Sequence, residues 1–316
     1  MASTGLWIGF GAGLLLLLVI DLLAFGRKPR SLSLREGAAW TAFWIGISLT
    51  FDLWLWHHAG SKAAIEFLSG YLVEKSLSVD NLFIFILIFQ YFSIELARQH
   101  RVLVWGVFGA LTLRGLLIAA GAVFIKAFSW SLYVLGAFLV YVALHLLLRK
   151  SKTVHMGANP VLRWLGKIVP TARDDGGESF FVRRDSRWMV TPLLLALVAI
   201  ESADLLFAMD SIPAVFGITR DPFIVFSSNA CAVLGLRALY FVVAKWITQL
   251  RHLGTGVSLV LLFIGSKMLA GHWMDISSGV SLAVIACLLA AATVASLLDK
   301  RPVKGDAKSA DLERQG

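Results

Sequence analysis

The chain has 316 residues, of which 58% are hydrophobic and 16% are charged. An ordinary soluble domain has about 25% charged residues, and intrinsic disorder requires low hydrophobicity together with many charges. The mean hydropathy of +0.77 therefore excludes both classes. It predicts a protein that crosses a membrane several times.

Nine apolar stretches are long enough to span a bilayer, which takes about 20 mostly apolar residues in a helix. The sequence thus predicts an all-α fold, a polytopic membrane helix bundle with about nine transmembrane helices. We expect the first stretch to be retained, because its positive charges follow the apolar run, the reverse of the order in a signal peptide. In chain order the predicted helices are Leu6–Phe25, Ala38–Trp56, Ala64–Phe92, Val102–Ile125, Leu132–Leu148, Val190–Phe216, Phe223–Ile247, Val257–Trp273 and Gly279–Leu298.

The loops between these stretches differ strongly in basic charge. Alternate loops hold 21 Lys and Arg residues on one side, whereas the other side holds three, Lys62, Lys126 and Arg220. Because Lys and Arg concentrate on the cytoplasmic side of membrane proteins, we expect the N-terminus outside and the C-terminus in the cytoplasm. The same rule accounts for the net charge of +9, so the partner expected is the lipid bilayer and not a nucleic acid.

Two parts of the chain resemble each other. Ser78-x-Asp80-x-Leu82-Phe83 recurs as Ser202-x-Asp204-x-Leu206-Phe207, and Leu111-x-Leu113-Arg114 recurs as Leu234-x-Leu236-Arg237. A second register pairs Glu74 and Asp80 with Asp204 and Asp210, and both registers stay open. The predicted helices that carry these motifs run in opposite directions, which predicts an inverted repeat of the kind found in secondary transporters.

This repeat divides the chain into six predicted segments. They are an N-terminal two-helix segment (1–61), a first three-helix repeat (62–148), a cytoplasmic basic loop (149–189), a second three-helix repeat (190–274), a final helix (275–298) and a cytoplasmic tail (299–316). We expect the third and sixth helices to be interrupted, because both carry charge near their middles and the sixth contains Pro213.

Those two helices contain five carboxylates, and each ionisable residue near the bilayer centre costs about 2.5–3.5 kcal/mol. Such a cost requires compensation by basic residues or by a bound cation. With the amide of Asn81 and the hydroxyl of Ser211, the carboxylates form a set of hard oxygen donors, which suits Mg²⁺, Ca²⁺ or Mn²⁺. The carboxylates are Glu74, Asp80, Glu201, Asp204 and Asp210, and the candidate counter-charges are Lys75, Arg114, Arg237 and Lys267.

The segments EKSLSVDNLFIF (74–85), IESADLLFAMDSIPAVFGIT (200–219) and DPFIVFSSNACAVLGLRALYF (221–241) resemble signature segments of the TerC/Alx family of integral membrane proteins. The resemblance extends over about residues 5–298, and the short tail is similar to the Alx-type branch. It implies manganese efflux across the bacterial inner membrane, with a link by name to tellurite resistance. The ion-handling positions it implies are Glu74, Asp80, Asn81, Glu201, Asp204, Asp210 and Ser211.

The leading hypothesis is therefore a secondary transporter that exports Mn²⁺, coupled to protons, without an organic cofactor. The alternative is a membrane assembly or metallation factor that delivers metal to translocated proteins and docks a partner on the 149–189 loop. A homo-oligomer is compatible with either hypothesis. An ATP-driven pump or an intramembrane enzyme is disfavoured, because the sequence has no GxxxxGK[ST] or HExxH motif. Direct tellurite chemistry is disfavoured as well, because neither of the two cysteines lies in a reactive motif.

Overall fold

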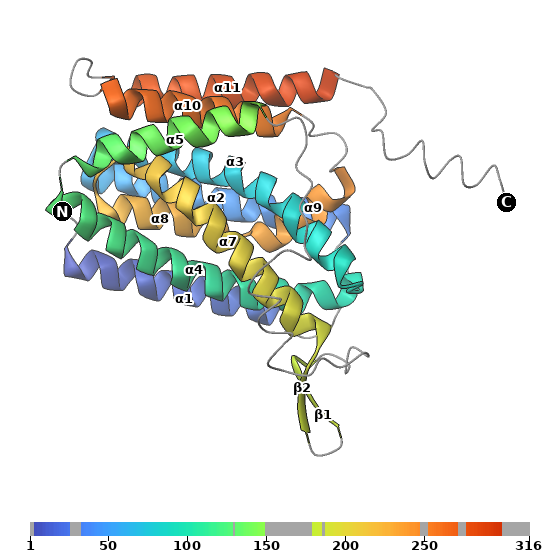
Figure 1. Ribbon diagram of the computed structural model, residues 1–316. Coiled ribbons are helices and arrows are strands. Elements are labelled where there is room, and N and C mark those ends of the chain that lie inside the picture. The colour runs from blue at the N-terminus through green and yellow to red at the C-terminus, as the bar shows by residue number, and fades with distance from the viewer. Residues whose placement is uncertain are drawn as a thin grey trace.

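The structure is a computed structural model, and it describes residues 3–25, 33–128, 130–148, 179–184, 187–246, 252–270 and 276–298. Its helices lie side by side in a bundle, and a small two-stranded hairpin projects from one end (Figure 1). The helices are α1 (Thr4–Phe25), α2 (Leu34–Ala59), α3 (Ser61–Tyr91), α4 (Leu96–Ala127), α5 (Ser131–Leu148), α7 (Pro192–Phe216), α8 (Pro222–Val233), α9 (Leu236–Trp246), α10 (Leu253–Ala270) and α11 (Ser278–Leu298).

The outside of the bundle is apolar. Ile8 on α1, Leu116 and Val123 on α4, and Leu298 on α11 are all more than 60% exposed. A water-soluble protein rarely exposes apolar side chains over so wide an area, whereas in a bilayer these side chains face lipid. Helices suit this environment because they satisfy their own backbone hydrogen bonds. The chain is a multi-pass integral membrane protein, as its composition predicts.

Local sequence signals set the helix starts. Ser33 and Glu36 form a reciprocal capping box at the start of α2. Pro192 occupies the first turn of α7 and Pro222 that of α8, where a missing N–H costs no hydrogen bond. Asp221 caps α8 by accepting a hydrogen bond from the backbone N–H of Phe223.

The hairpin consists of β1 (Phe181–Arg184) and β2 (Arg187–Val190), which pair antiparallel with Phe181 opposite Val190. It lies immediately before α7, in the segment predicted as a basic loop. Residues 149–178 of that loop and the tail 299–316 are outside the described residues. All other regular elements of the described residues are helices.

By length and apolar composition, six of the described helices qualify as membrane spans, and the bent pair α8 and α9 makes a seventh. Helix α3 carries several charged residues along its 31-residue length, and the described apolar part of α10, Gly254–Ala270, is shorter than a full span. The count of nine spans therefore remains a prediction.

The two helices predicted to be interrupted are continuous, so that prediction is wrong. Helix α3 runs unbroken past its charges, and α7 contains Pro213 in its last turn. Side chains compensate the charges of these helices, so the backbone does not need to unwind. The interruption lies in the predicted Phe223–Ile247 helix, where α8 and α9 meet at an angle of 44°.

Gly235 makes this break possible. Its φ of +79° lies in the left-handed region, and a Cβ there would come within 2.7 Å of three side-chain atoms of the buried Trp44 on α2. Only glycine satisfies both constraints. The break also leaves carbonyl groups at the end of α8 without helical partners, and the carbonyl of Ala232 accepts a hydrogen bond from Lys75 Nζ at 3.2 Å.

Helix α3 is the centre of the bundle and packs against α2, α7, α8, α9, α10 and α11. On one side of it, α5, α10 and α11 form a layer of their own (Figure 1). On the other side, α4 packs against α7 and α8. Groups from α3, α4, α7 and α8 therefore meet in the interior, where the predicted site residues lie.

The substitution Gly235→Ala should lower the stability of the protein by about 2 kcal/mol or more, because the new methyl group meets Trp44 in a backbone conformation that L-residues disfavour. Thermal unfolding in detergent measures this loss. Gly46→Ala is the matched control, since a Cβ at Gly46, which lies within α2, would have no neighbouring atom within 4 Å and alanine favours helices. Equal stability of the two variants would contradict this account of the break.

Candidate functional site: a buried carboxylate–guanidinium centre

One buried arginine joins two of the predicted carboxylates. Arg114 on α4 donates to Asp204 on α7 through Nε (3.0 Å) and Nη2 (2.7 Å), a bidentate pair. Its Nη1 donates to Glu74 on α3 and to the Oδ1 atom of Asn229 on α8 at 3.0 Å. Asn229 Nδ2 in turn donates to Glu74 Oε2 at 3.0 Å. We call these four residues the Arg114 centre.

The Arg114 centre is sealed from the surface and carries unequal charge. The exposed fractions of its residues range from 0% for Glu74 to 3% for Asp204. Buried charges are tolerated only when they are paired and hydrogen-bonded, and each of these groups has at least two such bonds. One guanidinium nevertheless faces two carboxylates, so the centre has a formal charge of −1 when all three groups are ionised.

Glu201 adds a third carboxylate one turn before Asp204 on α7. Its side chain lies against Gly109 on α4, where a Cβ would come within 2.0–2.5 Å of all three carboxylate atoms. Its Oε2 atom is buried and has no hydrogen-bond partner among the described residues. Gly109 thus provides the space that Glu201 occupies, and the negative charge around Arg114 increases further when Glu201 is ionised.

The remaining predicted donors are spread along α3 and α7. Ser211 is buried and its Oγ has no partner in the described part of the chain; the same holds for Ser78, which the repeat motif contains. Asn81 is buried, Asp210 is half-buried, and the side chain of Asp80 is outside the described residues. Buried oxygen atoms without partners are rare in proteins, so these two hydroxyls are candidates for a polar role in the site.

The other predicted counter-charges have partners elsewhere in the bundle. Lys75 caps the carbonyl end of α8, as described above. Arg237 on α9 binds Asp21 on α1 through Nη2 and Oδ1 at 2.6 Å, and its Nη1 lies 3.3 Å from His100 Nδ1. Lys267 Nζ donates to the hydroxyl of Ser281 at 2.8 Å.

Among the described residues, no cluster of three or more His, Cys, Asp or Glu side chains has the arrangement of a metal site. The described carboxylates among the predicted ligands are therefore not gathered around one point. Glu74 and Asp204 do come together, on Arg114, and Glu201 lies beside them.

Sequence reasoning missed Asn229, although the polar run Ser227-Ser228-Asn229 in an apolar stretch marks it. It also missed the buried Glu66, which accepts a hydrogen bond from the Thr219 hydroxyl at 2.6 Å.

Removing the central guanidinium should be strongly destabilising. Arg114→Met leaves two carboxylates buried together without their cation, and the expected loss is about 3–5 kcal/mol. Thermal unfolding in detergent measures it. Replacing the carboxylates as well, in the triple variant with Glu74→Gln and Asp204→Asn, should recover most of the loss. A single variant as stable as the wild type, or a triple variant as unstable as the single one, would show that the three charges do not act as a unit.

Comparison with known proteins agrees with the sequence motifs. Residues 59–304 match the family described as integral membrane protein TerC family. An "Uncharacterized membrane protein STKORF319" of Myxococcus xanthus is 41% identical over 95% of this chain and 94% of its own length. The "Putative membrane-bound redox modulator Alx" of Escherichia coli (strain K12) is 40% identical over 89% of this chain and 90% of its own length.

A third relative, an "Uncharacterized membrane protein" of Rickettsia bellii, is 34% identical over 94% of this chain and 98% of its own length. No solved structure matches the chain significantly. The family match covers most of the chain and includes every residue of the Arg114 centre, and the relatives match over nearly their whole lengths. The chain belongs to the TerC family of integral membrane proteins.

Proposed function

We propose that this protein exports Mn²⁺ across the bacterial inner membrane in exchange for protons. The observation that carries the proposal is the unequal charge of the Arg114 centre, where Glu74 and Asp204 share one guanidinium. A buried surplus of negative charge costs free energy. Binding of a cation or of protons at the centre during the transport cycle would offset this cost and explain why the carboxylates are there.

The donor chemistry supports a hard divalent cation. Carboxylate, amide and hydroxyl oxygens prefer Mn²⁺, Mg²⁺ or Ca²⁺ to softer metals. Glu74, Asp204 and Asn229 would supply oxygens at the centre, and Glu201 has an oxygen not used in any described hydrogen bond. In the metal-free protein, Arg114 provides the positive charge that keeps Glu74 and Asp204 together.

Two other functions compete with this proposal. A metallation or assembly factor would use the same buried centre and deliver the metal to a partner at the 149–189 loop. A redox role, which the name of the Escherichia coli relative suggests, would place chemistry on the two cysteines, the buried Cys231 on α8 and the exposed Cys287 on α11. Transport by the purified protein separates both alternatives from export.

Purified protein in liposomes should accumulate Mn²⁺ when a pH gradient is imposed. Glu74→Gln and Asp204→Asn should each lower the initial rate at least about tenfold, since loss of one metal-site group typically costs 10- to 100-fold, while leaving one carboxylate for Arg114. Asp80→Asn and Asp210→Asn test two further positions that the family resemblance implies. A fluorescent Mn²⁺ indicator inside the liposomes measures the rate.

Two variants serve as controls. Glu95→Gln removes a largely exposed carboxylate outside the bundle interior and should transport like the wild type. The double variant Cys231→Ser/Cys287→Ser should also transport normally if the function does not depend on thiols. If folded wild-type protein moves no Mn²⁺ under any imposed gradient, export is the wrong function, and the metallation factor becomes the leading hypothesis.

The position of Glu201 can be tested through its glycine neighbour. Gly109→Ala places a methyl group where the Glu201 carboxylate lies, so it should move that carboxylate and lower Mn²⁺ transport several-fold. Gly46→Ala on α2 is the control, because a Cβ there would have no neighbouring atom within 4 Å. Equal transport by the two variants would exclude Glu201 from the transport site.

A further inference from the structure

Two ionic centres lie at different depths in the bundle, and a small cavity separates them. The first is the Arg114 centre, and the second is the pair of Arg237 on α9 with Asp21 on α1. Asp204 and Arg237 both line the cavity. Its volume is about 20 Å³, which leaves room for about one water molecule. The cavity therefore links the two centres by position but is too small to conduct a hydrated ion.

The cavity lies on the side predicted to be cytoplasmic. Helices α1, α3 and α9 end there and α4 and α7 begin there (Figure 1). Asp21 is close to the end of α1 and His100 to the start of α4. The Asp21–Arg237 pair thus stands between the Arg114 centre and the cytoplasmic end of the bundle.

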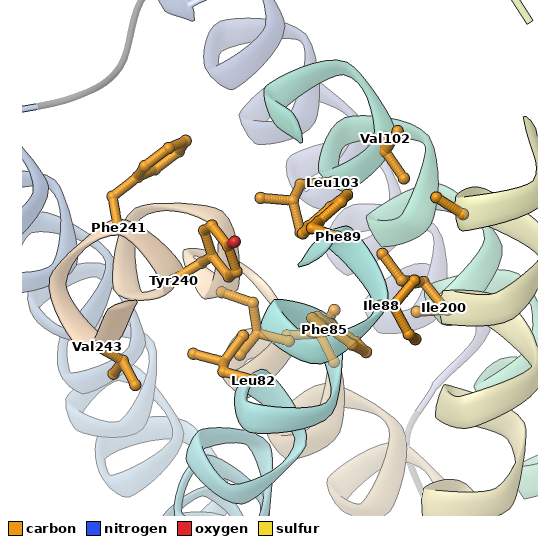
Figure 2. Packing of buried hydrophobic residues seen from close by; sticks show 14 of the residues in the cluster. Leu82, Phe85, Ile88, Phe89, Val102, Leu103, Ile200, Tyr240, Phe241 and Val243 are labelled. Carbon is orange, nitrogen blue, oxygen red and sulfur yellow. The ribbon is translucent and has the colours of Figure 1, made fainter. Parts of the chain in front are cut away.

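Apolar side chains close the space between the centres. The cavity is lined by Leu82 and Phe85 of α3, Val233 at the end of α8 and Leu236 at the start of α9. All four belong to one buried cluster, in which Phe85, Ile88 and Phe89 pack beside Leu103 and Tyr240 (Figure 2). The cluster thus encloses the cavity that Asp204 and Arg237 share.

The cluster includes side chains from both helices of the bent pair α8 and α9, the one such pair among the described residues. Val233 and Leu236 stand on opposite sides of the break at Gly235, so a change in the angle between α8 and α9 changes the width of the cavity. The two helices are held by different partners. Lys75 and Glu74 of α3 bind the carbonyl end of α8 and Asn229. Helix α9 is held by Asp21 of α1 through Arg237 and by Gln99 of α4, which accepts a hydrogen bond from Tyr240 at 2.6 Å.

We propose that the apolar cluster around Leu82, Phe85, Val233 and Leu236 is a cytoplasmic gate, and that the Asp21–Arg237 pair holds it shut. Breaking the pair loosens the part of α9 nearest Gly235, so that α9 can tilt about Gly235 and the cavity widens into a path to Asp204. The gate deepens the proposed function and rests on it for the identity of the ion. Its opening is a property of the chain that can be measured without that ion.

Cysteine accessibility tests the gate directly. In the Cys231→Ser/Cys287→Ser background, Ala110→Cys places a thiol in the cavity wall, one turn from Arg114. A charged, membrane-impermeant methanethiosulfonate reagent is applied separately to each face of membrane vesicles. With the pair intact we expect slow modification. Asp21→Asn should raise the rate about tenfold from the cytoplasmic face only.

Two further variants control for other causes. Leu116→Cys lies on the same helix but faces lipid with 65% of its surface exposed, and it should react slowly whether or not the pair is present. The charge exchange Asp21→Arg/Arg237→Asp restores a pair of opposite charges and should return the Ala110→Cys rate toward its original value. Arg237→Gln breaks the same pair and replaces Asp21→Asn if that variant folds poorly.

The gate is overturned if Ala110→Cys reacts at the same rate with and without the pair, if the increase comes from the outer face, or if the charge exchange does not reverse it. These outcomes are independent of Mn²⁺ transport. A gate that opens in a protein without Mn²⁺ transport would contradict the proposed function and leave the gate in place. Mn²⁺ transport together with an unchanged rate of Ala110→Cys modification would support the proposed function and contradict the gate.

Discussion

The structure depends on one buried guanidinium. A charge at the centre of a membrane protein is tolerated only with partners of excellent geometry, and Arg114 obtains them from three other helices. The bidentate bond to Asp204 fixes α4 against α7, and the bonds to Glu74 and Asn229 fix both against α3 and α8. These helices cannot slide past each other without exposing an unpaired charge. The same geometry leaves one carboxylate more than the guanidinium can neutralise, so the interaction that orders the bundle also makes its centre attractive to cations.

The break between α8 and α9 follows from the same centre. Asn229 is part of it, and Lys75 follows Glu74 directly in sequence and caps the carbonyl of Ala232. Helix α8 is therefore fixed at its inner end by two neighbouring residues of α3. A straight continuation would carry α9 in the same direction, but Gly235 turns the chain, and Trp44 fills the space beside it. The lysine thus replaces the helical hydrogen bond that the turn removes.

The apolar runs were sufficient to predict the helices and the membrane class, because hydrophobic length is a local property of sequence. The buried carboxylates were recognisable for the same reason, since charge within an apolar run is conspicuous. The partners were not predictable: spacing does not say that Arg114 reaches Glu74 and Asp204 while Arg237 reaches Asp21, 216 residues away. Charge in α3 and α7 was interpreted as a need for unwound backbone, but side chains from other helices met that need. The real break had a local signal, Gly235, yet one glycine in an apolar run is common and marks nothing by itself.

The two ion pairs differ in a way that bears on how such a protein can move. Arg114 and its partners are almost wholly buried, whereas the side chain of Asp21 is 20% exposed beside Arg237. Breaking a fully buried pair costs several kcal/mol, and the partial exposure of Asp21 makes its pair with Arg237 the less costly of the two to separate. A motion that separates α9 from α1 therefore costs less than one that breaks the Arg114 centre. The two centres have no residue in common, so the Arg114 centre can keep its geometry when the Asp21–Arg237 pair separates. A binding site needs this independence if its affinity is to change only when its own ligand arrives.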